Sequence, residues 1–356
     1  MGCYKNHLPF HITHVNLQYC LYDFKMSIKM KFTGVTFLLL LLSVSSSFAQ
    51  TREVKDLDSW RFFKGDIANA PDAAFNDAQW EAVKVPHDWA IYGPFDKEID
   101  KQTVKIVQNN EEQATEKTGR TGSLPFIGAA WYRKTFELPG FGGGKQVLLT
   151  FDGAMSNAEV YVNGKKAGNR PYGYSYFYFD ITEFIQPGKQ NVVAVRLENQ
   201  GFSSRWYPGA GLYRKVRLIV KDKVSFKHWG HFITTPLISE GVAKVNIKSQ
   251  VQGDNVSIKT IIRDANGKVV AENTASQRFA DEIEQHIAVN NPGLWSPETP
   301  TLYTAELKLF QGDVLKDVET IRFGIRKIRY SAEKGFELND KVTKFKGVCL
   351  HHDLGP

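Results

Sequence analysis

The stretch KQVLLTFDGAMSNAEVYVNGKKAG, residues 145–168, decides the fold class. It consists of two runs of β-type residues joined by a loop, and it ends in a hairpin signal. Asn163-Gly164 supplies the positive φ angles that a two-residue hairpin turn requires. The stretch therefore predicts strands that pair in an antiparallel sheet.

The same pattern continues in QNVVAVRLEN, residues 190–199, which follows a turn at Pro187-Gly188. Its apolar and polar residues alternate with the period of a half-buried strand. One face carries Val193, Val195 and Leu197, and the other carries Arg196 and Glu198. Because no long stretch with a helical period accompanies these strands, residues 50–222 are predicted to form an antiparallel β-sandwich.

A second all-β segment follows at residues 223–329. Its apolar runs recur about every ten residues and are separated by turns such as Ala265-Asn266-Gly267. This spacing is typical of an immunoglobulin-like β-sandwich of about 100 residues. The segment carries few candidate catalytic groups, so we expect it to support its neighbours.

Composition limits the classes of function. The chain has 356 residues with 42% hydrophobic and 13% aromatic residues, which indicates packed globular domains. The formal charge is +7, and residues 1–49, with four Lys and one Asp, contribute +3 of it. The remaining excess contains no basic run, so we expect no nucleic-acid partner.

The N-terminal part has the order of a secretory signal. Residues 26–49 begin with Lys29 and Lys31, continue with an apolar core, and end in Ser47-Phe48-Ala49. We expect cleavage after Ala49, export to the periplasm or the outside of the cell, and no membrane attachment afterwards. Residues 1–25 show no pattern and are interpreted as a wrongly chosen upstream start. Only Cys349 remains in the mature chain, so no intrachain disulfide is expected.

The C-terminal segment, residues 330–356, contains a hairpin followed by FKGVCLHHDLGP. A strand over residues 347–350 would deliver His351 and Asp353 to one face at its carboxyl end, which is where β/α barrels build their active sites. A solvated strand end is the simpler alternative. A zinc site is disfavoured because adjacent histidines point apart and no HExxH or CxxC spacing is present.

Aromatic residues form a second candidate site in NRPYGYSYFYFD, residues 169–180. Tyr174, Tyr176 and Tyr178 would share one face of a strand, with Phe177 and Phe179 on the other. Aromatic rings can stack on the apolar faces of sugars while phenol groups meet sugar hydroxyls. The alternative is that one face is core and the other is an interdomain contact.

Two further segments carry chemistry-bearing residues. In GFSSRWYPGAGLYRKV, Arg205 could reach a carboxylate and Trp206 could stack on a ligand, although a rigid interdomain loop fits equally well. In VKVPHDWAIYGPF, His87 and Asp88 suggest a triad, but the chain has no GxSxG elbow for a serine nucleophile. The polar residues 96–121 between these segments are expected to form a surface loop.

Taken together, these segments resemble family 2 glycoside hydrolases, the β-galactosidase-like enzymes. The resemblance runs over residues 52–356 and rests on motifs in the family order: WEAVKVPHDW, AWYRKTFELP, VLLTFDGAMSNAEVYVNGKKAG, FDIT, RWYPGAGLYRKV, LWSPETPTLY and FKGVCLHHDLG. It implies a jelly-roll sugar-binding domain, an immunoglobulin-like domain and the start of a TIM barrel at residues 330–356.

The resemblance also implies a retaining glycosidase that cleaves O-glycosyl bonds with two Glu residues about 5 Å apart. A barrel needs about 250 residues, so both glutamates are expected beyond Pro356 and no catalytic residue is expected in this chain. His351 matches a family histidine that contacts the sugar. Cys349 and Leu350 stand where some relatives have Asn and Arg, which leaves the contacts of that turn open.

The predicted substrate-binding residues are His351, Asp353, Arg205, Trp206, Tyr174 and Tyr176. The partner implied is a glycan or oligosaccharide. No cofactor is expected in this chain, although the full-length family includes Mg- and Na-dependent enzymes, and a homo-oligomer stays open. Two alternatives remain: a stand-alone carbohydrate-binding module, and a β-glucuronidase or β-mannosidase specificity.

Overall fold

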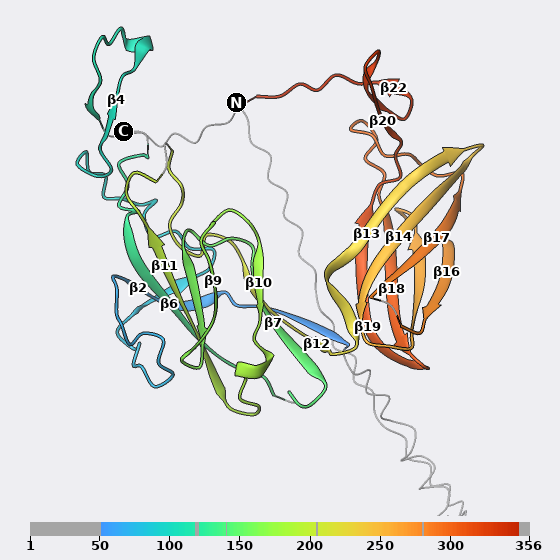
Figure 1. Cartoon of the computed structure of the whole chain (residues 1–356), viewed down its shortest axis with the longest axis horizontal. Coiled ribbons are helices and arrows are strands. Elements are labelled where there is room, and N and C mark those ends of the chain that lie inside the picture. Colours follow the sequence, from blue (N-terminus) through green and yellow to red (C-terminus); the bar gives the residue numbers. More distant parts are fainter. Residues whose placement is uncertain (1–50, 118–120, 140, 204–205, 280, 349–356) are drawn as a thin grey trace, which may run out of the picture. The chain divides into compact units, whose positions relative to one another are not determined.

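The computed structural model describes residues 51–117, 121–139, 141–203, 206–279 and 281–348. These residues form β-strands with two short 3-10 helices, η1 (Val107–Asn109) and η2 (Thr182–Phe184), and no α-helix within the described ranges (Figure 1). The all-β prediction is therefore confirmed for the described part of the chain.

The first sandwich consists of two antiparallel sheets. The four-stranded sheet has the order β1 (Arg52–Asp56), β12 (Val216–Asp222), β7 (Lys145–Phe151), β10 (Phe177–Asp180). The six-stranded sheet has the order β3 (Glu81–Lys84), β2 (Ser59–Lys64), β6 (Gly128–Glu137), β11 (Gln190–Asn199), β8 (Ala158–Val162), β9 (Lys165–Arg170).

The stretch 145–168 links these two sheets. Its first strand, β7, lies in the four-stranded sheet, whereas β8 lies in the six-stranded sheet, so the loop between them crosses the sandwich. The predicted hairpin turn is confirmed: Val162 pairs with Lys165, and Asn163 and Gly164 have φ angles of 51° and 83°. Positive φ at both central positions is the signature of a type I′ turn.

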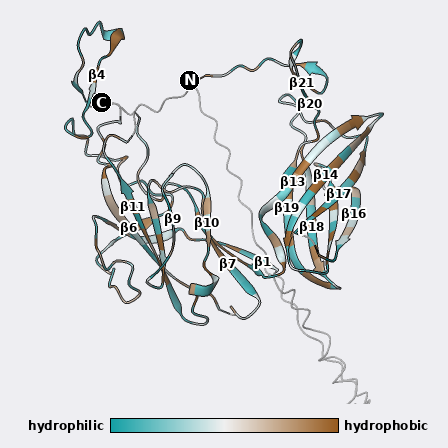
Figure 2. Cartoon of the chain, viewed as in Figure 1, coloured by the Kyte–Doolittle hydropathy of each residue, from teal (hydrophilic) through white to brown (hydrophobic). Residues whose placement is uncertain are grey.

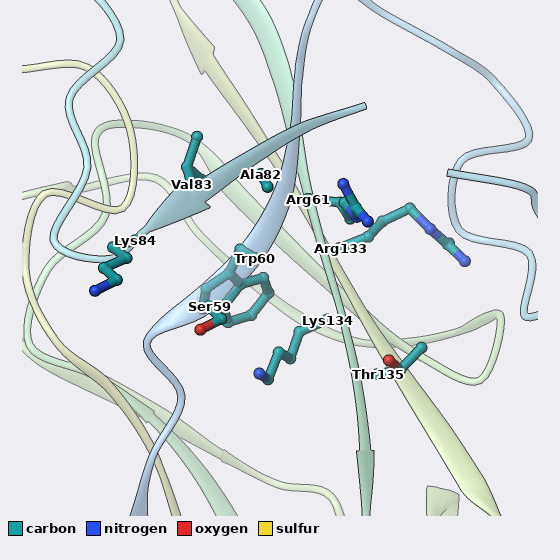
Figure 3. A pocket seen from close by; sticks show the side chains of 9 residues that line it. All are labelled: Ser59, Trp60, Arg61, Ala82, Val83, Lys84, Arg133, Lys134 and Thr135. Carbon is teal, nitrogen blue, oxygen red and sulfur yellow. The ribbon is translucent and has the colours of Figure 1, made fainter. Parts of the chain in front are cut away.

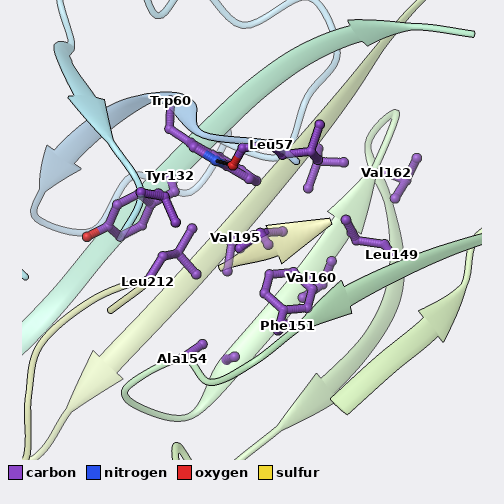
Figure 4. Packing of buried hydrophobic residues seen from close by; sticks show 14 of the residues in the cluster. Leu57, Trp60, Tyr132, Leu149, Phe151, Ala154, Val160, Val162, Val195 and Leu212 are labelled. Atoms are coloured by element: carbon purple, nitrogen blue, oxygen red, sulfur yellow. Dashed lines mark hydrogen bonds between the residues drawn. The ribbon is translucent and has the colours of Figure 1, made fainter. Parts of the chain in front are cut away.

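The core lies between the two sheets, as Figure 4 shows. Alternate residues of each strand point inward, including the predicted face Val193, Val195 and Leu197 of β11. They belong to one cluster with side chains from both sheets and from adjoining loops, among them Leu57, Trp60, Tyr132, Leu149, Phe151, Val160, Val162 and Leu212. Burial of this apolar surface is the main stabilising contribution to the domain.

A buried arginine attaches residues 66–80 to the outer face of the six-stranded sheet. Arg133, on β6, is only 1% exposed. Its guanidinium donates to Asp77 Oδ2 at 2.9 Å and to the carbonyls of Ala70, Asp72 and Phe75. Because all three guanidinium nitrogens meet an acceptor on this segment, the cost of burying the charge is offset. Figure 3 shows the Arg133 side chain beside that of Arg61 on β2, its partner in the strand ladder.

The second sandwich also has two antiparallel sheets. Its strands alternate apolar and polar residues along their length, as Figure 2 shows. One sheet has the order β13 (Ser225–Ser239), β14 (Val242–Gln252), β17 (Glu282–Asn290), and the other the order β16 (Val269–Gln277), β15 (Val256–Arg263), β18 (Tyr303–Gln311), β19 (Val314–Phe323). Isoleucine, valine and leucine side chains fill the space between them.

A buried ion pair connects β1 with β19. Arg52 Nε and Nη2 donate to the two carboxylate oxygens of Asp317 at 2.9 and 2.6 Å. Asp317, whose side chain is fully buried, also accepts the backbone N–H of Phe226 at 2.9 Å. The bidentate geometry and the third donor satisfy the carboxylate, as burial of a charge requires.

The polar segment before β6 has regular structure of its own. Residues 96–121 contain a two-stranded ribbon, β4 (Gln102–Val104) paired with β5 (Thr115–Lys117), so the prediction of a plain surface loop is wrong. Glu111 holds the ribbon together, because its carboxylate accepts the backbone N–H of Ile106 at 2.8 Å and pairs with Lys117.

The predicted C-terminal hairpin is present. β21 (Gly335–Leu338) pairs with β22 (Lys341–Val342) across the Asn339-Asp340 turn, and β20 (Ile328–Ser331) joins its other edge. Gly347 and Val348 have no regular secondary structure. The remainder of the expected barrel strand lies outside the described residues.

Candidate functional site

Two loops of the first sandwich are joined into one unit. His87 N donates to Leu212 O over 2.8 Å, and Trp89 N donates to Ala210 O over 3.0 Å. These bonds hold residues 86–90 against residues 207–212, and we call the two segments together the clasp. The motifs PHDW and YPGAGL, which are far apart in the sequence, therefore form a single structural element.

The carboxylate of Asp88 is the centre of the clasp. Its Oδ1 accepts the Tyr207 hydroxyl at 2.6 Å and the backbone N–H of Ala90 at 2.9 Å. Its Oδ2 accepts the backbone N–H of Ala210 at 3.0 Å. Three donors from both segments thus converge on one ionised group, and hydrogen bonds to a charged acceptor are stronger than neutral ones.

The phenol of Tyr207 stays protonated in this setting. Burial raises the pKa of Tyr207 well above its usual value, and the hydrogen bond to Asp88 raises it further. Its ring lies edge-on to Phe126 at a centroid distance of 6.1 Å. Tyr207 is therefore a permanent donor to Asp88 and serves to position the loop.

His87 and Asp88 do not act as a pair. The Nδ1 of His87 lies 2.7 Å from the Tyr132 hydroxyl, and its ring packs on Phe62 at 4.9 Å. Burial lowers the pKa of His87, which keeps the imidazole neutral. Because the two neighbouring side chains go to different partners, the hydrogen bonds of this segment do not build a catalytic triad.

The glycine at position 211 is required by the clasp. Gly211 has φ of +119° and forms an isolated antiparallel bridge with Met155. A Cβ at this position would collide with the Tyr132 hydroxyl and with the His87 carbonyl. Both the backbone conformation and the lack of space exclude a side chain.

Asn199 secures the clasp from the opposite side. Its Nδ2 donates to the carbonyls of Phe126 and Gly209 at 3.1 and 3.0 Å, and its Oδ1 accepts the Ser156 hydroxyl at 2.8 Å. Asn199 is buried at the end of β11. The 207–212 segment is thus held rigidly by Asp88, Met155 and Asn199.

Aromatic side chains adjoin the clasp. Trp206 directly precedes it and is 48% exposed, and its Nε1 donates to the Tyr174 hydroxyl at 2.9 Å. Tyr172 meets Tyr174 edge-on at 5.6 Å and is also exposed. An exposed indole oriented by a hydrogen bond on a rigid loop is suited to stacking on the apolar face of a sugar.

Tyr176 lies in a different environment from Tyr174. Its hydroxyl is 2.5 Å from His228 Nε2, and its ring packs on Trp229 at 4.0 Å, both on β13. Tyr178 meets the same His228 ring at 4.9 Å, so Tyr176 and Tyr178 lie on one side as predicted. The prediction is wrong for Tyr174, which contacts Trp206 instead, and β10 begins only at Phe177.

The segment before β10 is held by its own hydrogen bonds. The Gly173 carbonyl accepts from Ala154 N and from the Tyr213 hydroxyl, at 3.1 and 3.0 Å. Tyr176 is an interdomain packing residue. Three other predicted site residues, Arg205, His351 and Asp353, lie outside the described residues.

The structure adds residues that the sequence did not single out as a group. Asp88, Tyr207, Asn199 and Gly211 build the clasp, although the sequence suggested only a His-Asp pair and a glycine-rich turn. The one local signal was the density of Gly and Pro after Tyr207, which marks a turn without identifying its partner.

No group of three or more His, Cys, Asp or Glu side chains in the described ranges is arranged to hold a metal ion. Within the same ranges, no helix has the length and apolar character needed to cross a membrane.

Family models match most of the described chain. Residues 54–222 match the sugar binding domain of glycosyl hydrolases family 2, and residues 228–326 match a second model of glycosyl hydrolases family 2. The two matches correspond to the two sandwiches.

Known proteins agree with this match. The chain is 37% identical to the β-galactosidase BoGH2A of Bacteroides ovatus, over 87% of this chain and 36% of that protein. It is 34% identical to a putative β-glucuronidase of Formosa agariphila, over 92% of this chain and 30% of that protein.

Solved structures show the same architecture. A glycosyl hydrolase family 2 member from Bacteroides cellulosilyticus superposes with a TM-score of 0.74 at 34% identity, covering 84% of this chain and 38% of that one. The chain thus spans between 30% and 38% of the length of these relatives. From its two domain matches, its relatives and its fold, the chain belongs to glycosyl hydrolases family 2.

Proposed function

We propose that this chain forms the non-catalytic β domains of an exported, retaining glycosidase of the β-galactosidase type. The observation that carries the proposal is the 37% identity to a β-galactosidase over 87% of this chain. The reaction would be hydrolysis of O-glycosyl bonds in a glycan, with catalytic carboxylates supplied by a barrel outside the described residues.

We further propose that the chain is inactive without that barrel. A retaining glycosidase needs two carboxyl groups about 5 Å apart that are free to meet the glycosidic bond. The buried carboxylates of the described residues are engaged elsewhere: Asp100 accepts Phe202 N, Asp317 pairs with Arg52, and Glu337 pairs with Arg329. None of the three is free for that chemistry.

In this proposal the clasp presents Trp206 and Tyr174 to the sugar. The indole of Trp206 supplies a stacking face, and its hydrogen bond to Tyr174 keeps it in one orientation. Because Asp88 and Asn199 fix the loop behind it, little conformational entropy would be lost on binding. Both residues would bind and orient the glycan and take no part in bond cleavage.

The sugar specificity has two candidates. Several relatives are named β-glucuronidases, including the putative enzyme of Formosa agariphila, which supports glucuronide as the alternative to galactoside. A β-mannosidase specificity has no such support among these relatives. A stand-alone carbohydrate-binding module is the second function that an exposed Trp206 favours.

The test begins with the coding sequence beyond the codon for Pro356. We expect an in-frame or frameshifted continuation that encodes a barrel with two strand-end glutamates. The restored protein should hydrolyse a chromogenic β-galactoside with retention of configuration, whereas the 356-residue chain should hydrolyse neither the β-galactoside nor the β-glucuronide.

The outcomes separate the candidates. If the restored protein cleaves the glucuronide faster than the galactoside, the proposed galactoside specificity is wrong and the glucuronide takes its place. A stop codon without a downstream barrel, together with glycan binding by the chain, would favour the binding module. Export has its own test: sequencing the N-terminus of the secreted protein should begin at Gln50.

A further inference from the structure

The sequence contains two Asn-Gly pairs, and both lie in hairpin turns. Asn163-Gly164 joins β8 to β9, and Asn266-Gly267 joins β15 to β16. Their flanking residues are nearly the same, Val-Asn-Gly-Lys in the first turn and Ala-Asn-Gly-Lys in the second. A large difference in the chemistry of the two asparagines must therefore come from the fold around them.

An asparagine that precedes glycine can lose its side-chain amide in a reaction that needs only water. The backbone nitrogen of the glycine attacks the asparagine Cγ, the new N–Cγ bond closes a succinimide ring, and the Cγ–Nδ2 bond breaks. The proton given up by the glycine nitrogen leaves on the departing ammonia. Water then opens the ring at either carbonyl, which yields aspartate or isoaspartate. Glycine favours the attack because it carries no side chain beside the nitrogen.

The side chain of Asn163 is held at both of its polar atoms. Its Nδ2 donates to the Phe184 carbonyl and to Asn191 Oδ1, both at 2.8 Å. Its Oδ1 accepts the backbone N–H of Val192 at 2.9 Å. Turning the Asn163 Cγ toward the Gly164 nitrogen would break all three bonds and leave the buried Asn191 without this donor.

The first sandwich also covers Gly164. A Cβ at this position would lie 3.8 Å from the Pro71 carbonyl oxygen and 3.9 Å from Ala73 N. Both belong to the segment 66–80 that Arg133 attaches to the sheet. The turn between β8 and β9 is therefore restrained from two sides against ring closure.

The turn that contains Asn266 has neither restraint. Residues 265–268 are all exposed. The backbone N–H of Asn266 donates to Asp264 Oδ1 at 2.9 Å, but no described residue makes a hydrogen bond to its side-chain amide. A Cβ on Gly267 would meet no atom within 4 Å, so there is space beside the attacking nitrogen.

One hydrogen bond restrains the attacking nitrogen itself. Gly267 N donates to the Asp264 carbonyl at 3.0 Å and closes the turn. The bond lies at the exposed end of the β15–β16 hairpin, and β16 is the edge strand of its sheet. Exposed backbone bonds at such ends open by local fluctuation without global unfolding. The Gly267 nitrogen therefore becomes available in the folded protein.

We propose that Asn266 is a site of spontaneous deamidation in the folded protein, whereas the fold protects Asn163. The product carries a carboxylate at the β15–β16 turn in place of an amide. A cation already lies at this turn, because Arg263 Nη1 donates to the Gly267 carbonyl at 3.3 Å. The modification site is independent of the proposed glycosidase function.

The experiment is a time course of the full chain at mildly alkaline pH, in native buffer and in guanidinium chloride that unfolds it. Water labelled with heavy oxygen marks product that forms during the incubation, since the label enters when the ring opens. Mass spectrometry of the two Asn-Gly peptides gives the rate at each site. Asn163 is the matched control within the same chain, and Gly267→Ala is the test variant.

In the folded chain, Asn266 should convert at least about tenfold faster than Asn163, because Asn163 must first lose three hydrogen bonds. In guanidinium chloride the two rates should become similar, because the flanking residues are nearly the same. Gly267→Ala should slow the reaction at Asn266 and leave the rate at Asn163 unchanged.

Three results would overturn the proposal. One is an equal rate at the two asparagines in the folded chain. Another is an Asn266 that stays intact in the folded chain over the time in which both sites convert in guanidinium chloride, which would show that its turn is protected. The third is a difference between the sites that persists in the unfolded chain, which would assign the effect to local sequence.

Discussion

The Tyr207 hydroxyl donates to Asp88 over 2.6 Å, although the two residues are 119 positions apart. This contact joins the loop after β3 to the loop before β12 and completes the three-donor environment of the carboxylate. The rigidity of the clasp, and with it the orientation of Trp206, depends on this pair.

The first prediction concerns the coupling of this pair. Tyr207→Phe should lower the free energy of unfolding by about 1–3 kcal/mol, because it removes a hydrogen bond to an ionised and partly buried acceptor. Asp88→Ala should cost more, since it also leaves Ala210 N and Ala90 N without their acceptor. A double-mutant cycle in urea should give a coupling energy of about 1–3 kcal/mol.

A matched control for this cycle is Tyr172→Phe, because the Tyr172 side chain is exposed. Its effect on unfolding should be within about 0.5 kcal/mol. Additive effects of Asp88→Ala and Tyr207→Phe would show that the contact does not form in solution.

The second prediction concerns Gly211. Gly211→Ala should destabilise the first sandwich by roughly 3 kcal/mol or more, because the new Cβ meets Tyr132 and His87 in addition to the strained φ. Gly267→Ala is the control: Gly267 also has positive φ, +82°, but faces open space. Gly267→Ala should lower the free energy of unfolding by about 1 kcal/mol. Thermal unfolding measures both variants, and an equal loss of stability in the two would refute the steric argument.

The third prediction concerns stability in acid. Burial, with a contribution from Arg52, lowers the pKa of His231 to about 4, whereas the unfolded value is about 6.5. As the pH falls, the unfolded chain therefore binds a proton at this histidine before the folded chain does. The contribution of neutral His231 to stability is present above pH 6.5 and is lost as the pH falls toward 4.

His231→Gln should flatten this part of the stability–pH curve, with a difference on the order of 2–3 kcal/mol between pH 7 and pH 4. The neighbouring Glu319, whose pKa is raised by burial, acts with the opposite sign, so the comparison must be made between the parent and this variant. Parallel curves for the two proteins would contradict the prediction. Urea unfolding at stepped pH values measures it.

The fourth prediction separates binding from folding at the clasp. Trp206→Ala should weaken glycan binding about tenfold or more, because a lost stacking face costs about 1–3 kcal/mol, while the unfolding temperature should change little for an exposed side chain. Trp229→Ala removes an indole that is also exposed but packs on Tyr176, and it should leave glycan affinity unchanged. Equal losses of affinity in the two variants would exclude a specific role for Trp206.

The strands and turns of both sandwiches could be predicted from local sequence. In β11 the alternation of Val193, Val195 and Leu197 with Arg196 and Glu198 matches the observed burial, because a strand exposes its two faces with period two. The turn at Asn163-Gly164 could also be predicted, because a turn with positive φ at two consecutive positions favours these residues.

The candidate site was only partly predictable. Tyr174 and Trp206 were singled out separately, but their hydrogen bond and the separate position of Tyr176 were not foreseen. The aromatic alternation suggested a longer strand, whereas β10 begins only at Phe177. The hydroxyls of Tyr174 and Tyr176 meet Trp206 and His228, and contacts between residues so far apart in the chain leave no local signal.

The sequence by itself determined the β class of the chain, its hairpin turns, its family resemblance and the residue types available for sugar contact, because propensity and periodicity are properties of neighbouring residues. Only the tertiary structure decided that Asp88 meets Tyr207 and that Asn199 holds the carbonyl of Gly209. These contacts depend on which strands and loops become neighbours, and the folded topology alone sets that.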